Sequence, residues 1–349
     1  MKHILLLDRE QYGYHIDTLK YCDFLSLNYQ VTLFCINNKL PKVKEKNINV
    51  EYSPYFRNEK IRTAMFLLLC IVKMIRLHGI VFIHYFPYCY ILKILFPHKK
   101  MVLDIRTLSV SENLKQRQNF DNHLKHACSK FKYVSVISKG VADILGVHDY
   151  FLLPLGAEHI SSVQKKYQKL RLLYVGTFYN RHLEKTIEGL FLFLKNNPKV
   201  DIKYQIIGFG EGEDVVKQSI SQYKLNKNVE FLGRKQYSEL KQYFDIANIG
   251  VSFVPITDYY NYQPPTKTFE YVLSGLYCIA TKTEANKEVI SDVNGVLIND
   301  TSGDFCNALE IVYQKRQYIR EAAVRQSLDD YTWNNLLNKY FTPILKVLS

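Results

Sequence analysis

A lysine and a glutamate lie three residues apart in the stretch NYQPPTKTFEYVLSG, which runs from Asn261 to Gly275 and predicts the start of a buried helix. Burial of an ammonium or a carboxylate group costs free energy unless a partner compensates for the lost water. Lys267 could therefore neutralise an anion, and the two oxygens of the Glu270 carboxylate could accept hydrogen bonds from a vicinal diol. The alternative is an ion pair between the two residues on one helix face, without any ligand.

The residues around this pair indicate where the helix begins and ends. Two prolines end the preceding loop, Thr266 is a predicted N-cap, and Gly275 is a predicted left-handed stop. A capping box would need an acidic residue three positions after Thr266, and that residue is Phe269. Capping therefore does not explain the carboxylate of Glu270.

Short apolar runs alternate with longer segments of helical period, a pattern typical of buried parallel strands joined by crossover helices. The runs are HILLL, QVTLFCI, GIVFIHY, KMVLDIR and YVSVIS, and later LRLLYVG, KYQIIGFG, NVEFLG, IGVSFVP, YCIAT and GVLIN. A polar linker is expected at about 155–169. The prediction is an α/β protein with two doubly wound Rossmann-like domains, residues 1–160 and 161–330, facing a central cleft.

The last segment predicts a helix over residues 331–349 that packs back on the N-terminal domain. Its apolar residues recur every three to four positions and so share one helical face. They are Trp333, Leu337, Phe341, Leu345 and Leu348.

Five segments carry a family resemblance through their order and spacing: LLYVGTF, IIGFGEGED, NVEFLG, PPTKTFEYVLSGLYCIAT and NGVLI. Together they resemble the nucleotide-sugar half of glycosyltransferase family 4, whose members are retaining enzymes of the GT-B fold. The resemblance implies that the second domain binds a nucleotide-diphosphate sugar and that the first domain binds the acceptor. The implied acceptor is a glycan or a lipid-linked glycan, and the implied pathway is cell-surface polysaccharide biosynthesis.

The resemblance assigns roles within the opening stretch. Glu270 matches the second glutamate of the family's E-x7-E motif, which binds the donor ribose. Tyr262 stands where the family has the first glutamate, near the sugar, and is a catalytic candidate. Thr266 and Lys267, at the helix N-terminus, are the expected donors to the diphosphate.

The segment GTFYNRHLEK departs from the family pattern. Gly176 ends a strand, but Thr177 and Leu183 occupy the positions of the family's arginine and lysine. Arg181 is the expected substitute, with Lys185 as the second choice. The alternative for Arg181 is an exposed residue at a helix start.

Glycines at Gly208, Gly210 and Gly212 follow a strand and are expected to line the nucleotide pocket. They also resemble part of a dinucleotide fingerprint, although the full G-x-G-x-x-G is absent. Glu230 has the separation expected of a ribose-binding acid but lies inside a predicted strand. A dinucleotide-dependent oxidoreductase, a sugar-nucleotide epimerase of the same architecture and a noncatalytic relative remain the alternatives.

No metal or other cofactor is expected. The sequence has no D-x-D pair to hold Mg²⁺ or Mn²⁺ on a sugar diphosphate, and no H-x-x-x-H or H-E-x-x-H. Cationic side chains and helix dipoles would then neutralise the leaving diphosphate.

The first half offers four site candidates near predicted strand ends. Gly13 belongs to a loop expected near the donor phosphates, and Arg106 is a candidate for the same phosphate or acceptor region. His84 and Asp104 are the catalytic candidates. A structural histidine at position 84, and a pair formed by Asp104 with Arg106, are the alternatives.

The net charge of +13 is concentrated in the first 165 residues, which hold 23 Lys and Arg against 13 Asp and Glu. The segment IRTAMFLLLCIVKMIRLHG predicts a helix too short to cross a bilayer, with Arg62, Lys73 and Arg76 on one side. An interfacial helix on anionic lipid is one interpretation and a core helix the other. Further basic residues of this half are Lys39, Lys42, Lys44, Lys46, Lys99 and Lys100.

The seven cysteines form no C-x-x-C pair and mostly lie in apolar runs, which favours a reducing compartment. The start of the chain has too few apolar residues before its first charges for a signal peptide. We therefore expect a cytoplasmic protein, peripheral on the inner face of the membrane, without nucleic-acid partners.

Overall fold

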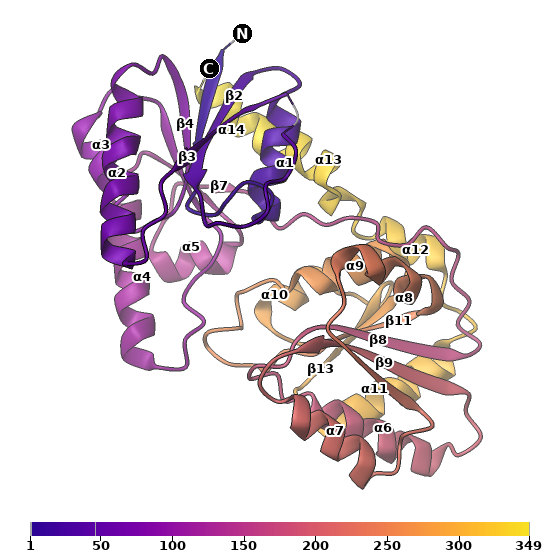
Figure 1. Cartoon of the computed structure of the whole chain (residues 1–349). Coiled ribbons are helices and arrows are strands. Elements are labelled where there is room, and N and C mark those ends of the chain that lie inside the picture. The colour runs from indigo at the N-terminus through magenta and orange to yellow at the C-terminus, as the bar shows by residue number, and fades with distance from the viewer. Residues whose placement is uncertain (1, 46, 349) are drawn as a thin grey trace. The chain divides into compact units, whose positions relative to one another are not determined.

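The computed structural model describes residues 2–45 and 47–348, so Lys46 lies outside the described residues. The chain divides into two compact units. The first combines Met1–Leu155 with Trp333–Ser349, and the second is Gly156–Thr332. Figure 1 shows a sheet with flanking helices in each unit.

The first unit contains a seven-stranded parallel sheet in the order β3-β2-β1-β4-β5-β6-β7. Its strands are β1 His3–Leu7, β2 Gln30–Ile36, β3 Asn49–Ser53, β4 Gly79–His84, β5 Met101–Ile105, β6 Tyr133–Val136 and β7 Phe151–Leu152. Its helices are α1 Ile16–Leu25, α2 Glu59–Ile75, α3 Tyr90–Leu95, α4 Leu114–Cys128, α5 Lys139–Leu145, α13 Trp333–Leu336 and α14 Thr342–Leu348. The strand order reverses between β1 and β4, and such switch points are where open α/β sheets bind ligands.

The second unit contains a six-stranded parallel sheet in the order β10-β9-β8-β11-β12-β13. Its strands are β8 Leu170–Thr177, β9 Ile202–Phe209, β10 Val229–Gly233, β11 Ile249–Ser252, β12 Tyr277–Thr281 and β13 Gly295–Ile298. Its α-helices are α6 Glu184–Asn196, α7 Glu213–Gln222, α8 Leu240–Ile246, α9 Thr266–Leu273, α10 Glu284–Lys287, α11 Ser302–Lys315 and α12 Glu321–Gln326. Single 3₁₀ turns lie at Tyr237–Glu239 and Asp329–Tyr331. The switch point of this sheet lies between β8 and β11.

Every strand that the apolar runs predict is present, which confirms two Rossmann-like α/β units. The runs are buried because helices cover both faces of each parallel sheet. The strands β3 and β7 were not predicted. β3 is an edge strand with the half-buried polar residues Glu51 and Tyr52, and β7 has only two residues.

Helix α9 confirms the predicted stop and corrects the predicted cap. Gly275 has φ +77, and the N–H of Leu276 donates to Tyr271 O at 2.9 Å, as expected of a left-handed helix end. The helix begins at Thr266 itself, so the N-cap position is Pro265, whose side chain offers no hydrogen bond. Thr266 is therefore not the cap, because proline fits immediately before a helix and its fixed φ starts the first turn.

The C-terminal segment lies in the first unit and interrupts its helix with a π-helical turn at Leu337–Phe341. Pro343 follows that turn, and its ring would clash with the carbonyl four residues earlier in a regular α-helix. The five apolar residues predicted to share a face are all buried. Phe341 stacks on Tyr21 of α1, with 4.9 Å between ring centroids.

The predicted linker has no helix or extended strand over its described residues 155–169, yet it is hydrogen-bonded to the second unit. The ammonium group of Lys165 donates to the backbone oxygens of Phe244 and Asp245. Ala157 forms a bridge with Thr332. All seven cysteines are free and buried, as expected of thiols that act as small apolar side chains.

Candidate functional site

The carboxyl end of β8, beside the switch point of the second sheet, holds a lysine over an aromatic ring. The ammonium nitrogen of Lys267, in the first turn of α9, lies 3.9 Å from the centroid of the Tyr174 ring. It also lies close to Gly176, where an added Cβ would be 3.5 Å from the Lys267 Nζ. The face of the Tyr174 ring therefore packs against the ammonium group at the strand end.

Arg181 approaches the same strand end from the loop between β8 and α6. Its guanidinium carbon lies 4.2 Å from the centroid of the Tyr260 ring. Its Nη1 atom is buried and has no hydrogen-bond partner. Arg181 also lines a cavity of about 240 Å³ with Asn180 and Gly212.

Two cations thus lie near each other without a compensating acid. The pKa of Lys267 is lowered well below its usual value by burial and then by the positive charge of Arg181. No carboxylate among the described residues forms an ion pair with either cation. Like charges that share a site favour binding of an anion, because the anion relieves both their repulsion and their desolvation.

Glu270 follows one helical turn after Lys267 and lies in a different electrostatic environment. Burial, together with the negative charge of Glu158, raises the pKa of Glu270 to about 7. The described residues include no ion pair between Glu270 and Lys267, so the surface-pair alternative does not describe this structure. Burial and the same two carboxylates raise the pKa of the nearby Tyr237 to about 12.

Of the remaining predicted donor-site residues, some are open to a ligand and one is already hydrogen-bonded within the protein. Thr266 is exposed in the first turn of α9. Gly210 has φ +111 with open space where a side chain would be. The Lys185 ammonium group, however, donates to the Asp300 carbonyl at 3.0 Å, which gives this second-choice residue a structural contact.

Gly208 is a glycine because two strands approach each other closely at this point. An added Cβ would lie 2.0 Å from Gly176 O and 2.7 Å from the Phe178 ring. This packing accounts for the glycine without a dinucleotide. Glu230 is the second residue of β10 and accepts a hydrogen bond from Gln205 at 2.8 Å, so it does not lie at the carboxyl end of its strand.

A stacking surface that the sequence analysis missed lies at the end of β9. The Phe209 ring is 43% exposed, and the guanidinium carbon of Arg234 lies 4.5 Å from its centroid. An exposed aromatic residue between two glycines, directly after an apolar strand, is the signal that could have revealed it. Such a ring can stack against a flat heterocycle.

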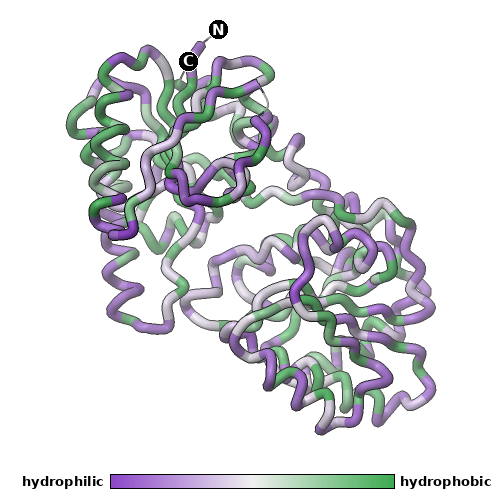
Figure 2. Tube along the Cα trace, in the orientation of Figure 1, coloured by the Kyte–Doolittle hydropathy of each residue, from purple (hydrophilic) through white to green (hydrophobic). Residues whose placement is uncertain are grey.

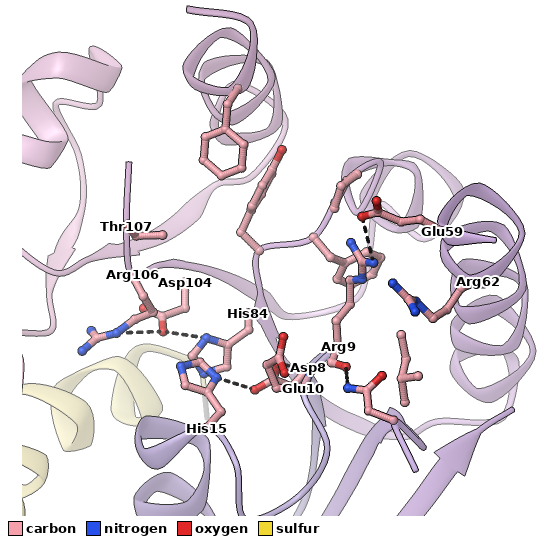
Figure 3. A pocket seen from close by; sticks show the side chains of 16 residues that line it. Asp8, Arg9, Glu10, His15, Glu59, Arg62, His84, Asp104, Arg106 and Thr107 are labelled. Carbon is pink, nitrogen blue, oxygen red and sulfur yellow. Dashed lines mark hydrogen bonds and ion pairs between the residues drawn. The ribbon is translucent and has the colours of Figure 1, made fainter. Parts of the chain in front are cut away.

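The switch point of the first sheet holds the second cluster, which Figure 3 shows. His84 ends β4 as predicted, and its Nδ1 lies 3.5 Å from the Asp104 Oδ2. The other carboxylate oxygen of Asp104 accepts a hydrogen bond from the Ser135 hydroxyl at 2.6 Å. The Nε2 of His84 is buried without a hydrogen-bond partner. Burial lowers the pKa of His84 and raises that of Asp104, although each group partly offsets the effect of burial on the other.

Two residues of this cluster, Asp8 and His15, were missed by the sequence analysis. The Nδ1 of His15 lies 2.7 Å from Asp8 Oδ2, and the Thr18 hydroxyl donates to the same oxygen. Burial opposes ionisation of Asp8, but His84, His15 and Thr18 outweigh it and lower its pKa. Burial likewise opposes protonation of His15, but its contact with Asp8 raises its pKa. The available signal was their position after the first apolar strand.

Asp8, His15 and His84 also form the one group that could hold a metal ion among the described residues. One ligand atom from each lies within 4.8 Å of the others. They come from the end of β1, the loop after it and the end of β4, so no local spacing motif could have revealed them. Asp104 would orient His84 in such a site, as carboxylates do for metal-binding histidines.

Arg106 and Gly13, the two predicted phosphate-region residues, have structural contacts. Arg106 Nε donates to Asp17 Oδ2 at 2.7 Å, and its other nitrogens donate to the carbonyls of Leu153 and Pro154. The Nε of Arg106 is 3.9 Å from Asp104 Oδ2, so the expected pair of Arg106 with Asp104 is longer and weaker than the pair of Arg106 with Asp17. Gly13 has φ +90, and an added Cβ would clash with Val43.

A cavity of about 620 Å³ opens over this cluster. Asp8, His15, His84 and Asp104 line one part of it, and Arg9 and Arg62 line another (Figure 3). The cavity can therefore receive a polar molecule beside both a carboxylate–histidine pair and cationic side chains. Tyr262, the third catalytic candidate, lies in the second unit, in the loop between β11 and α9.

Comparison with known proteins gives a family match for one part of the chain. Residues 169–315 match the family model described as Glycosyl transferases group 1. This segment includes Gly176, Arg181, Lys267 and Glu270. No curated protein matches the sequence of the chain.

Several solved structures match nearly the whole chain at low sequence identity. Sucrose-phosphate synthase from Thermosynechococcus elongatus has 14% identity and a TM-score of 0.74, covering 100% of this chain and 99% of that one. The lipopolysaccharide outer core galactosyltransferase WaaB, in its apo form, has 15% identity and a TM-score of 0.75, covering 99% of both chains. The Anabaena protein HepE, in complex with UDP, has 12% identity and a TM-score of 0.73, covering 100% of both. These likenesses confirm the GT-B fold.

Proposed function

Because residues 169–315 form a Glycosyl transferases group 1 domain within a GT-B fold, we propose that the protein is a glycosyltransferase. The donor is a nucleotide-diphosphate sugar bound by the second unit. The acceptor is a glycan or a lipid-linked glycan bound by the first unit, in the synthesis of a cell-surface polysaccharide.

The observation that carries this proposal is the pair of cations at the carboxyl end of β8. Lys267 and Arg181 have no carboxylate partner among the described residues, and Arg181 keeps a buried donor unused. A diphosphate supplies the missing negative charge and several acceptor oxygens. The N-terminus of α9 adds a partial positive charge beside it.

Glu270 completes the donor site in this proposal by accepting hydrogen bonds from the two ribose hydroxyls. Its carboxylate must ionise to accept both, and its pKa of about 7 places that ionisation near neutral pH. Phe209 and Arg234 provide a flat surface on which the base can stack.

The reaction we propose retains the anomeric configuration, as the family resemblance implies. The bond between C1 of the sugar and the diphosphate oxygen breaks, and the acceptor oxygen bonds to C1 on the same face. The acceptor proton passes to the leaving phosphate. Lys267 and Arg181 stabilise the charge that develops on this phosphate, so no metal is required for that step.

In the first unit we propose that the cavity over His84 and Asp104 holds the acceptor. His84 lines this cavity beside the acceptor, and Asp104 fixes the orientation of its ring. Tyr262 replaces the acidic residue that the family resemblance places near the donor sugar. Its hydroxyl then binds the sugar without adding negative charge.

A thermal-shift screen tests the proposal against its main alternative. Ligand at a hundred times its dissociation constant stabilises a protein by about 2.7 kcal/mol, so UDP or GDP should raise the melting temperature measurably. Stabilisation by NAD or NADP alone would overturn the proposal in favour of an oxidoreductase. An epimerase would bind the same nucleotide sugar but leave the label of a radioactive donor in an isomeric nucleotide sugar, rather than in a glycan.

A further inference from the structure

Helix α2 of the first unit has two apolar faces, although a globular protein needs only one. Its inner face packs into the unit through Thr63, Phe66, Cys70 and Met74. Its outer face carries Ile61, Leu68, Val72 and Ile75, which are 52%, 53%, 54% and 64% exposed. Their spacings of seven, four and three residues place them in one stripe along roughly 20 Å of the helix.

The neighbouring helix α3 extends this outer face. It contacts α2 and carries Ile94 and Leu95, which are 57% and 52% exposed. Figure 2 shows the hydrophobic colouring of both helices at the margin of the first unit. We call Ile61, Leu68, Val72, Ile75, Ile94 and Leu95 the outer stripe.

The charged residues that follow the start of α2 and flank the outer stripe are cationic, whereas Glu59, the first residue of α2, pairs with Arg9. From residue 60 to residue 103 the sequence contains seven Lys and Arg and no Asp or Glu. Lys60 and Arg76 are exposed at the two ends of α2, and His98 is exposed after α3. Lys73 instead pairs with Glu51, and Arg62 lies over the Tyr55 ring, so these two cations do not contribute to the outer stripe as the sequence had suggested.

We propose that the outer stripe is the surface by which the protein binds an anionic lipid bilayer. Aliphatic side chains would enter the boundary between headgroups and acyl chains, while Lys60, Arg76 and His98 face the lipid phosphates. None of the helices in the described part of the chain is long and apolar enough to cross a membrane. The helix therefore lies on the bilayer surface.

The positive charge around the outer stripe favours an anionic bilayer over a second copy of the chain as its binding partner. A symmetric dimer through the outer stripe would bring the same cations of both copies together without any acidic residue from this segment to offset them. An anionic bilayer offsets them directly. This inference deepens the proposed function by explaining how the protein reaches a lipid-linked acceptor. It rests on the proposed function in this respect only.

Co-sedimentation of the full chain with vesicles tests the inference. Wild-type protein should bind vesicles of phosphatidylcholine with phosphatidylglycerol, and bind pure phosphatidylcholine vesicles at least about tenfold more weakly. The double variant Leu68→Gln, Val72→Gln should lose at least about tenfold in the partition coefficient, because two aliphatic anchors are removed. The variant Arg76→Gln should lose less, and its loss should disappear in high salt because the charge is then screened.

The matched control is Leu27→Gln with Leu114→Gln, since both leucines are exposed in the same unit but lie outside the outer stripe. This control should bind vesicles like the wild type. Equal vesicle binding by the wild type and the Leu68, Val72 variant would overturn the inference. So would a wild-type dimer in analytical ultracentrifugation that this variant abolishes, since the outer stripe would then be a contact between copies.

Nucleotide binding separates this inference from the proposed function. All variants should keep the circular dichroism spectrum and the UDP or GDP affinity of the wild type, because none of the changed residues lies in the second unit. Lost vesicle binding with intact nucleotide binding confirms the stripe. Vesicle binding without any nucleotide affinity in the wild type would leave the membrane surface standing and overturn the glycosyltransferase proposal.

Discussion

The ammonium nitrogen of Lys267 lies 3.9 Å from the centre of the Tyr174 ring and has no carboxylate partner among the described residues. A cation over an aromatic face is stabilised by roughly 0.5–2 kcal/mol, which does not replace the hydration lost on burial. The arrangement therefore holds the Lys267 amine in place, and because burial lowers its pKa, an anionic ligand beside it would favour its charged form.

The variant Lys267→Ala should weaken binding of UDP or GDP by roughly 10- to 100-fold, because it removes one charge-assisted hydrogen bond. Binding of uridine or guanosine, which lack the diphosphate, should change little. The control is Lys185→Ala, whose ammonium group contacts the Asp300 carbonyl and should leave nucleotide affinity unchanged. Isothermal titration calorimetry measures the affinity of each variant for the nucleotides and for the nucleosides. Equal losses of nucleotide affinity in both variants would contradict the assignment of Lys267 to the diphosphate.

The affinity for a nucleoside should rise with pH around pH 7. The pKa of Glu270 is about 7, and only the ionised carboxylate accepts hydrogen bonds from both ribose hydroxyls. At pH 5.5 or so the folded protein must release a proton to bind, whereas near pH 8.5 it need not. Uridine and guanosine avoid titration of the phosphates. A flat affinity profile between these pH values would contradict the role of Glu270.

The variant Glu270→Gln should remove this pH dependence and lower affinity for nucleoside and nucleotide alike, by roughly 1.5–3 kcal/mol per lost hydrogen bond at most. Its free energy of unfolding has a distinct signature. The folded pKa of Glu270 is above the ordinary value of 4.5, so wild-type stability falls as pH rises from 4.5 to about 7. Denaturant unfolding should show a smaller fall in the free energy of unfolding for Glu270→Gln than for the wild type over this pH range. Unfolding curves of the two proteins that shift identically with pH would contradict the raised pKa of Glu270.

The site residues show which parts of the function could be read from the sequence. Glu270 was expected from its match to a motif of the family that the sequence resembles, Lys267 from its place at a helix N-terminus, and Arg181 as the substitute for a basic residue of that family. Asp8 and His15 were not predicted as site residues, and their contact with His84 depends on the topology, which brings β1 and β4 together from positions about 75 residues apart. The orientation of Arg106 toward Asp17 also depends on packing, which no local pattern encodes.

Arg106→Ala should test whether Arg106 serves the fold or a ligand. Its guanidinium group is largely buried and bonded to Asp17 and to two carbonyls, so its loss leaves a buried carboxylate unpaired. The free energy of unfolding should fall by roughly 3–5 kcal/mol. Nucleotide affinity of the remaining folded protein should be unchanged. Weakened binding at full stability would instead assign Arg106 to a phosphate.

Transfer should proceed without a divalent metal ion, since Lys267 and Arg181 already offset the charge of the diphosphate. Turnover of a labelled donor should be the same in EDTA as in Mg²⁺ or Mn²⁺. Activity that is lost in EDTA and restored by a metal would contradict this prediction. The variant His84→Gln would then show whether the metal ion binds at Asp8, His15 and His84, because an ion held by these residues would bind this variant more weakly.

The second unit should bind nucleotide diphosphate on its own, provided that the fragment begins at residue 156. Residues 155–169 were predicted to be a linker, but Lys165 donates to the carbonyls of Phe244 and Asp245. Arg325 donates to the carbonyls of Ser161 and Val163. These contacts hold the start of the unit against α8 and against α12, the last α-helix of the unit.

A fragment of residues 156–332 should therefore match the full chain in UDP or GDP affinity, because Lys267, Arg181 and Glu270 all lie within it. A fragment of residues 168–332 loses the contacts of Lys165 and leaves the Arg325 guanidinium group without two of its acceptors. It should melt at a lower temperature, since each unmade buried hydrogen bond costs about 1–3 kcal/mol, and it should still bind nucleotide while folded. Tight nucleotide binding by residues 1–155 instead would reverse the assignment of donor and acceptor to the two units.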